Sequence, residues 1–146
     1  MNPLQDHVSN PMTPEQSKAQ VLDAAREIVG ALDLQVVRAS FGHSSCNDDG
    51  VAPFRGEVGI AYPLAARFEQ SDAEVAKMVQ HLQSLGWTGD PDFHSHGAVL
   101  KKNNVVAEFD SQNASSSYRG IHLYGECRDV TTTKETKGSD EDITFR

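Results

Sequence analysis

Two amphipathic segments, residues 14–31 and 72–85, most constrain the fold, because each is followed by short segments that alternate like strands. The first begins at "TPEQ". There Thr13 can cap a helix, Pro14 suits the first helical position and Gln16 can close a capping box. Apolar residues then recur at helical spacing: Val21, Leu22, Ala25, Ile28, Val29 and Leu32. We therefore predict a helix over residues 14–31.

The second helix is predicted over residues 72–85. "SDAE" at residues 71–74 has the pattern of a capping box, and an apolar stripe follows it. The stripe consists of Val75, Met78, Val79, Leu82 and Leu85. Gly86 stands where a helix C-terminus favours glycine, and we expect Trp87 to fold back as a lid over the last turn.

The strand-like segments set the rest of the fold. "LQVVRASF" (34–41) is rich in β-branched residues, and "FRGEVGIAY" (54–62) alternates along one apolar face. Residues 93–110 read as a hairpin whose turn, "KKNN", supplies Asn103 and Asn104 for positive φ. A last strand is predicted over residues 118–127.

The resulting order is α-β-β-α-β-β-β. Each element has one apolar face to bury, so we predict an α+β two-layer sandwich, with two helices packed on one face of an antiparallel sheet. The length of 146 residues suits a single domain, placed at residues 13–130. We expect residues 1–12 to be a disordered tail and residues 131–146 a polar C-terminal tail.

Composition excludes several classes of partner. The formal net charge is −8, which disfavours nucleic acid and anionic lipid, since both require a basic face. No apolar run is long enough to span a membrane. The first residues, "MNPLQDHVSN", lack the pattern of a signal peptide, so the chain is either cytosolic or a mature form.

The chain has two cysteines, Cys46 and Cys127, each at the end of a predicted strand. In an oxidising compartment this placement favours a disulfide. Free thiols, metal ligation and catalysis remain alternatives. A thiolate nucleophile needs a base within reach, but His43 lies three residues from Cys46 and would share its face only through a turn.

"DFHSHG" (92–97) is the candidate metal site. His94 and His96 are two residues apart, so on a strand both side chains leave the same face. A third ligand would have to come from elsewhere, such as His122 or Asp92. Solvent-facing polar residues at the start of a hairpin are the alternative.

We find no sequence motif for a phosphate loop, a nucleophile elbow or a zinc protease, and we expect no enzymatic activity and no cofactor. A binding surface is expected on the sheet face away from the helices or on an open sheet edge. The candidates for such a surface are Arg55, Glu57, Arg119 and Tyr124.

Four features together resemble small actinobacterial cell-envelope lipoproteins of the mycobacterial LppA-like type. They are the N-terminal helix, the strand leading to "SSCNDDG", the helix ending in "LQSLGWTGDPDF" and the strand ending in "YGECRDV". The resemblance covers about residues 15–130. It implies an exported domain with a Cys46–Cys127 disulfide, whose membrane contact is only through an acylated N-terminal cysteine that this chain lacks.

The leading hypothesis is therefore a non-enzymatic, secreted or lipid-anchored envelope domain that binds an unknown protein, peptide or small ligand. A metal-binding protein that uses His94 and His96 is one alternative. The other is a small acidic immunity-type inhibitor in the cytosol, which would carry reduced thiols.

Overall fold

The structure is a computed structural model that describes residues 8–89, 98–110, 112 and 115–145. The described residues form two α-helices, one 3₁₀ turn and seven strands. In chain order these are α2 (Pro14–Leu32), β1 (Arg38–Ser45), β2 (Phe54–Tyr62), η1 (Phe68–Gln70), α3 (Ser71–Ser84), β3 (Thr88–Gly89), β4 (Ala98–Lys102), β5 (Val105–Phe109), β6 (Arg119–Tyr124) and β7 (Glu141–Asp142).

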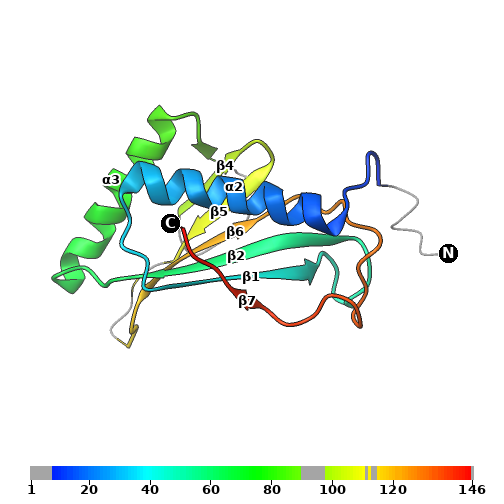
Figure 1. Ribbon diagram of the computed structural model, residues 1–146. Helices are drawn as coiled ribbons and strands as arrows, with labels where there is room; N and C mark the ends of the chain where they lie inside the picture. Colours follow the sequence, from blue (N-terminus) through cyan, green and yellow to red (C-terminus); the bar gives the residue numbers. More distant parts are fainter. Residues whose placement is uncertain (1–7, 90–97, 111, 113–114, 146) are drawn as a thin grey trace.

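The strands form one seven-stranded sheet in the order β3-β4-β5-β6-β2-β1-β7, and every pairing is antiparallel. Figure 1 shows α2 in front of the sheet, along its central strands, and α3 near the end of α2. The predicted α+β fold with two helices on an antiparallel sheet is confirmed. Two short edge strands, β3 and β7, add to the predicted order.

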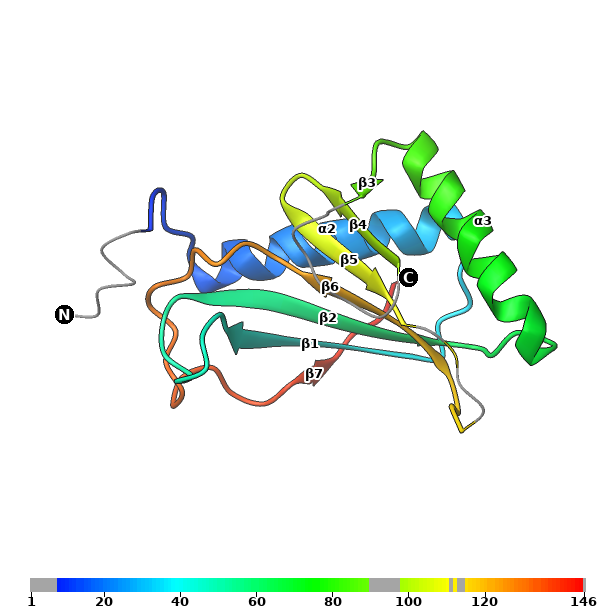
Figure 2. The ribbon, with the colours of Figure 1, turned by 180° about the vertical axis from the view of Figure 1, so that it is seen from behind.

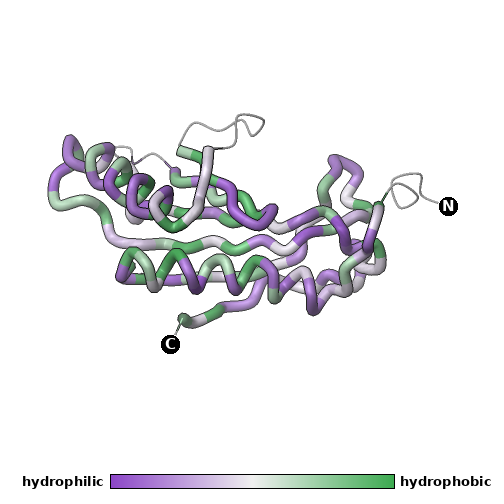
Figure 3. The backbone as a smooth tube through the Cα atoms, turned by 90° about the horizontal axis from the view of Figure 1, so that it is seen from above, coloured by the Kyte–Doolittle hydropathy of each residue, from purple (hydrophilic) through white to green (hydrophobic). Residues whose placement is uncertain are grey.

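Helix α2 begins as predicted. The Thr13 hydroxyl accepts a hydrogen bond from the Gln16 backbone N–H, and the Gln16 side chain accepts one from the Thr13 N–H. The helix ends at Asp33, which adopts a left-handed conformation at φ 47°. Its buried face carries Val21, Ala25 and Ile28, which share one side of the helix. In Figure 3 hydrophobic and hydrophilic stretches accordingly alternate along the long helix.

Helix α3 begins differently from the prediction. The 3₁₀ turn η1 leads directly into it, so Ser71 is already helical (φ −58°, ψ −47°). A capping residue needs extended backbone, and the predicted capping box at 71–74 is therefore wrong. At the other end, Gly86 has φ +102° and Trp87 is buried. The Trp87 backbone N–H donates to the Leu82 carbonyl (3.1 Å), so the predicted lid is confirmed.

Strand β1 is displaced from its predicted position at 34–41 to Arg38–Ser45. The cause is its hairpin with β2, whose register runs from Arg38 opposite Ala61 to Ser45 opposite Phe54. A strand ending at residue 41 would leave half of β2 unpaired on this side. Strand β2 itself lies at its predicted position, residues 54–62, with alternate residues buried.

The remaining hairpin is confirmed where the structure describes it. Asn103 and Asn104 have φ of 51° and 65°, as a tight turn between β4 and β5 requires. The first predicted residues of this hairpin, 93–97, lie outside the described residues. Strand β6 is shorter than the predicted 118–127, so Cys127 follows the strand.

The segments expected as tails make specific contacts. The Met12 backbone N–H donates to the Arg128 carbonyl at 2.8 Å. Within residues 131–146, strand β7 pairs with β1, and Ile143 and Phe145 pack against the core. No helix in the described part of the chain is long and apolar enough to cross a membrane.

Helix α2 approaches β2 closely at Gly56. A Cβ added there would lie 2.7 Å from the Ser17 carbonyl oxygen and 2.9 Å from the Val21 Cγ1. Real Cβ atoms do not make such contacts, and a helix backbone cannot swing aside as a side chain can. The packing of the helix on the sheet therefore depends on a glycine at this position.

We predict that Gly56→Ala lowers the free energy of unfolding by about 1–3 kcal/mol, because the methyl group overpacks the contact with α2. The matched control is Gly59→Ala on the same strand, where an added Cβ meets nothing closer than 3.7 Å. Gly59→Ala should be neutral or stabilising by up to about 1 kcal/mol. Urea unfolding measures both, and equal effects would contradict the close approach.

Candidate binding groove on the open face of the sheet

The sheet face opposite α2 carries small side chains along its centre. Figure 2 views the molecule from behind, with β1, β2 and β6 in front of α2. The register places Ser40 of β1, Gly59 of β2 and His122 of β6 in one row across the strands. Because residues two apart share a face, Ala61 and Gly120 lie in the next row on this face.

Two neighbouring hollows lie on this face and share Ser40, Gly59 and His122. One, of about 570 Å³, extends toward Arg38 and Tyr118. The other, of about 560 Å³, extends toward Lys134 and Lys137. We call the two together the sheet-face groove.

At the centre of the groove His122 is hydrogen-bonded to Asp110 at 2.9 Å, between Nε2 and Oδ2. An ionised carboxylate can only accept, so Nε2 carries the proton and a neutral ring leaves Nδ1 as an acceptor. Gly120 makes room for the pair, since a Cβ there would lie 2.8 Å from the Asp110 Oδ2.

The other ring nitrogen faces the floor of the groove. The His122 Nδ1 and the Ser40 Oγ each lie 3.7 Å from the position that a Gly59 Cβ would occupy. No hydrogen bond joins the two groups, although both residues are in the described part of the chain. Gly59 thus leaves the surface between a ring nitrogen and a hydroxyl free of any side chain.

The C-terminal segment forms one wall of the groove. Asp140 lies directly over Gly42, and the Lys134 Cε lies 2.8 Å from the position of a Gly50 Cβ. Gly50 has φ +72°, a conformation that other residues rarely adopt. These two glycines allow the segment to lie close against β1 and the following hairpin loop.

Asp129 holds the start of this wall in place. It is fully buried, and its backbone exchanges two hydrogen bonds with Phe54 of β2 (2.7 and 3.1 Å). Its carboxylate accepts from the backbone N–H groups of Thr131 and Thr132, each at 3.0 Å, and from both hydroxyls. Burial by itself raises the pKa of Asp129, but the hydrogen bonds from Thr132 and Thr131 outweigh it and hold the pKa below its usual 3.8.

The candidate binding residues divide between the two faces. Arg55, Glu57 and Tyr124 belong to the open face, and the Arg55 guanidinium lies 4.6 Å from the centre of the Tyr124 ring. Burial, followed by the charge of Glu57, raises the pKa of Tyr124 to about 12, so the phenol stays protonated. The Arg119 side chain lies on the helix side. It is buried, over the Tyr62 ring and 2.8 Å from a Glu74 oxygen.

The candidate metal ligands His94, His96 and Asp92 lie outside the described residues. His122, the other possible metal ligand, is hydrogen-bonded to Asp110. Within the described ranges, no three His, Cys, Asp or Glu side chains form a group that could hold a metal ion. The metal site therefore stays a prediction.

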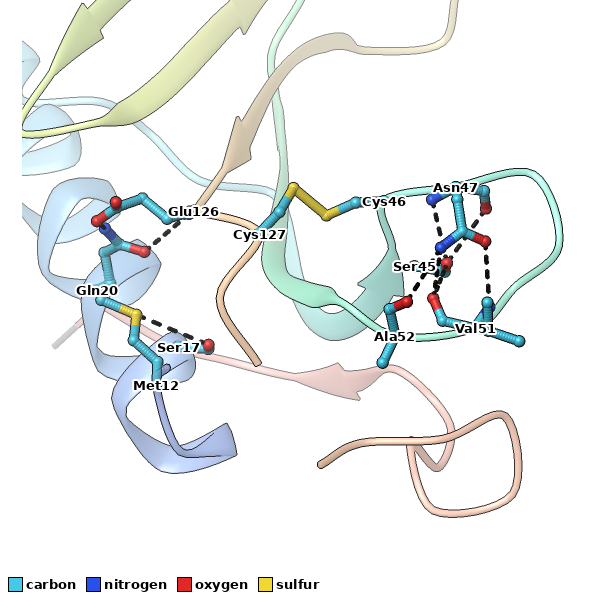
Figure 4. The surroundings of a disulfide bond; sticks show 10 residues. All are labelled: Met12, Ser17, Gln20, Ser45, Cys46, Asn47, Val51, Ala52, Glu126 and Cys127. Atoms are coloured by element: carbon cyan, nitrogen blue, oxygen red, sulfur yellow. Dashed lines mark hydrogen bonds between the residues drawn. A yellow bond between two sulfur atoms is a disulfide. The ribbon is translucent and has the colours of Figure 1, made fainter. Parts of the chain in front are cut away.

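Cys46 and Cys127 form a disulfide that joins positions 81 residues apart. Figure 4 shows it between the loop after β1 and the segment after β6. On one side, Gln20 of α2 exchanges hydrogen bonds with Glu126, at 2.7 and 2.9 Å. On the other, Asn47 orders the loop by donating to the Val51 carbonyl at 2.8 Å. The chain-entropy model assigns such a loop about 4–5 kcal/mol of stabilisation.

Sequence reasoning missed the central pair of the groove, Asp110 and His122. Asp110 stands directly after β5, and His122 lies on the same strand face as Gly120. The usable signal was Gly120 two residues before His122 in "YRGIHLY", because a glycine within a strand marks a place where another group approaches closely.

Domains of this class, with an α+β fold, one disulfide and a polar groove, have many functions. Similarity to known proteins shows to which family this chain belongs. The family model described as "Putative lipoprotein LppJ" matches residues 13–146. Proteins with that description from two Mycobacterium tuberculosis strains (CDC 1551 / Oshkosh and H37Rv) and from Mycobacterium bovis are each 40% identical over 132 residues. The match covers 89% of this chain and 68% of each relative.

The chain therefore belongs to the LppJ lipoprotein family, which confirms the resemblance to mycobacterial lipoproteins. No solved structure matches it significantly.

We predict a pH-dependent role for Asp129. Its pKa is lower in the folded than in the unfolded chain, so its stabilisation is present above about pH 4 and is lost as pH falls through the folded pKa. Asp129→Asn should cost about 1–3 kcal/mol at pH 7, and this difference from wild type should shrink below about pH 4. Urea unfolding across that range measures it, with the exposed Asp48→Asn as control. A difference independent of pH would contradict the assignment.

Proposed function

We propose that this chain is a non-enzymatic cell-envelope domain, secreted or lipid-anchored, that binds a polar ligand in the sheet-face groove. The observation that carries the proposal is the centre of the groove. The His122 Nδ1 and the Ser40 hydroxyl face a common space over Gly59, and Asp110 holds the imidazole ring. A fixed ring beside a bare floor is suited to orienting a bound polar group.

The family supports the location. The relatives are described as lipoproteins, and lipoproteins are held at membranes by acylation of an N-terminal cysteine. The Cys46–Cys127 disulfide agrees with an oxidising compartment. The alternative of a cytosolic inhibitor expects reduced thiols, so the paired cysteines count against it.

The geometry favours binding over catalysis. A serine nucleophile needs its hydroxyl within hydrogen-bond reach of a base. Here the Ser40 hydroxyl and the His122 ring lie on either side of the space over Gly59, with no hydrogen bond between them. Because the imidazole does not bond to the Ser40 hydroxyl, it does not activate this hydroxyl as a nucleophile. Both groups are instead left to contact a ligand.

We predict that the cysteines are paired in cells. The gene is expressed in a mycobacterium, and the thiols of the protein are trapped in acid and alkylated under denaturing conditions. Cys46 and Cys127 should then take up label only after reduction. Intact mass measures the label, and fractionation should place the protein with the envelope. Label on both cysteines without reduction would contradict the proposal that the protein is exported.

We predict that a detergent-free, soluble extract of mycobacterial envelope perturbs the groove. In amide NMR spectra, the shifts of Ser40, Gly59, Gly120 and His122 should move and saturate. In Gly59→Val the γ carbons fill the space beside His122, and these shifts should be lost. The matched control is Gly89→Val, a strand glycine with nothing within 4 Å of an added Cβ.

Gly89→Val should respond like wild type. Shifts confined to another surface, or none with any extract, would contradict a binding role for the groove.

A further inference from the structure

We infer that the ligand of the sheet-face groove is an uncharged, linear, hydroxyl-rich glycan segment. This inference rests on the proposed function and names the chemistry of its ligand. Four properties of the groove carry it: its charge balance, the hydrogen-bonding groups at its centre, the exposed ring at one end, and the use of the surrounding backbone.

The charges of the groove cancel. Arg119 also borders the groove, but its side chain lies on the helix side and is paired with Glu74. The other charged residues of the groove are three cations and three carboxylates: Arg38, Lys134, Lys137, Glu57, Asp110 and Asp140. The chain as a whole carries a net charge of −8, so this balance is local to the groove. A polyanion or polycation would meet as many like charges as opposite ones, whereas a neutral ligand gains both donors and acceptors.

The cations of the groove remain available to a ligand. Elsewhere in the described chain, ion pairs engage Lys102 with Glu27 and Arg119 with Glu74. The structure gives Arg38, Lys134 and Lys137 no ion pair with any described residue. These side chains can donate to ligand oxygens without first breaking a salt bridge.

The centre of the groove is matched to a hydroxyl group. A ligand hydroxyl that settles between these two side chains meets the His122 Nδ1 as an acceptor and the Ser40 hydroxyl as a donor. A hydroxyl performs both roles at once. A hydroxyl can pair with Nδ1 whether or not that nitrogen carries a proton, whereas a carboxylate or phosphate oxygen, which only accepts, can pair with it only when the ring is protonated.

An aromatic ring stands at one end. Tyr118, which directly precedes β6, lines the groove and is 47% exposed. Aromatic rings combine an apolar face with a polar tip, which suits the apolar face and hydroxyl rim of a pyranose. The two hollows meet at His122, so the site is elongated and suits several sugar units in a line.

A peptide fits less well. Extended peptides gain affinity by main-chain hydrogen bonding to a free strand edge. Both β2 and β6 lie inside the sheet, and the groove lies over their faces, where the main-chain groups are already used in the ladders. Over these two strands the ligand meets side chains, so it must bring its own dense set of donors and acceptors.

The test titrates the protein with maltotetraose, cellotetraose and chitotetraose, followed by amide NMR. At least one should give saturable shifts centred on Ser40, Gly59, Gly120 and His122, with Kd near or below about 1 mM. Because the ligand is uncharged, its affinity should stay constant when the salt concentration is raised. Tetragalacturonate and inorganic phosphate, the charged comparators, should bind more weakly.

Two variants separate specific binding from surface effects. Gly59→Val should weaken binding by about tenfold or more, and Tyr118→Ala should weaken it several-fold through loss of the ring. Gly89→Val should bind as wild type does. Amide spectra of the unliganded variants report whether each is folded before its affinity is compared.

Two results would overturn the inference: no shifts with any of the three neutral tetrasaccharides at about 20 mM, or stronger binding of the charged comparators. If envelope extract still perturbs the groove in that case, the ligand class is wrong and the proposed function stands. Loss of the extract's effect after protease treatment would identify a protein partner instead. If neither extract nor oligosaccharide acts on the groove, the proposed function falls as well.

Discussion

The contact between α2 and β2 at Gly56 determines how the rest of the structure is arranged. With no side chain there, the helix backbone reaches the strand, and Val21 packs directly on the sheet. The same helix passes close to Gly125, where Gln20 Oε1 lies 2.8 Å from the position of a Cβ. Gln20 then fixes Glu126 by two hydrogen bonds, one residue before the disulfide. The helix thus positions the segment that carries Cys127.

Strand β2 uses glycine on both of its faces, for different physical reasons. Gly56 faces the helix and removes a collision, whereas Gly59 faces the open side and removes bulk between Ser40 and His122. An alanine would overpack the contact with the helix at the first position and would be tolerated at the second. Packing therefore explains why residue 56 is a glycine. Packing does not require a glycine at position 59, where the missing side chain leaves the groove open between Ser40 and His122.

Local patterns predicted the parts of the fold that depend on neighbours in sequence. The capping box at Thr13, the alternation of β2 and the two-asparagine turn were all read correctly. The errors arose where distant residues decide. Pairing with β2 moved β1 by four residues, and η1 removed the cap at Ser71. The Asp110–His122 pair joins the residue after β5 to β6, and no spacing along the chain indicates that these two side chains meet.

The C-terminal segment is anchored at two points, by the buried Asp129 beside β2 and by β7 beside β1. Between these points it bridges the outer side of β1, which would otherwise be an open edge of the sheet. Exposed edges offer unpaired N–H and C=O groups to other chains, and such edges are sites of aggregation. The segment that shapes one wall of the groove therefore also covers part of the β1 edge, so changes in residues 129–142 would alter both the shape of the groove and the tendency of the sheet to pair with other chains.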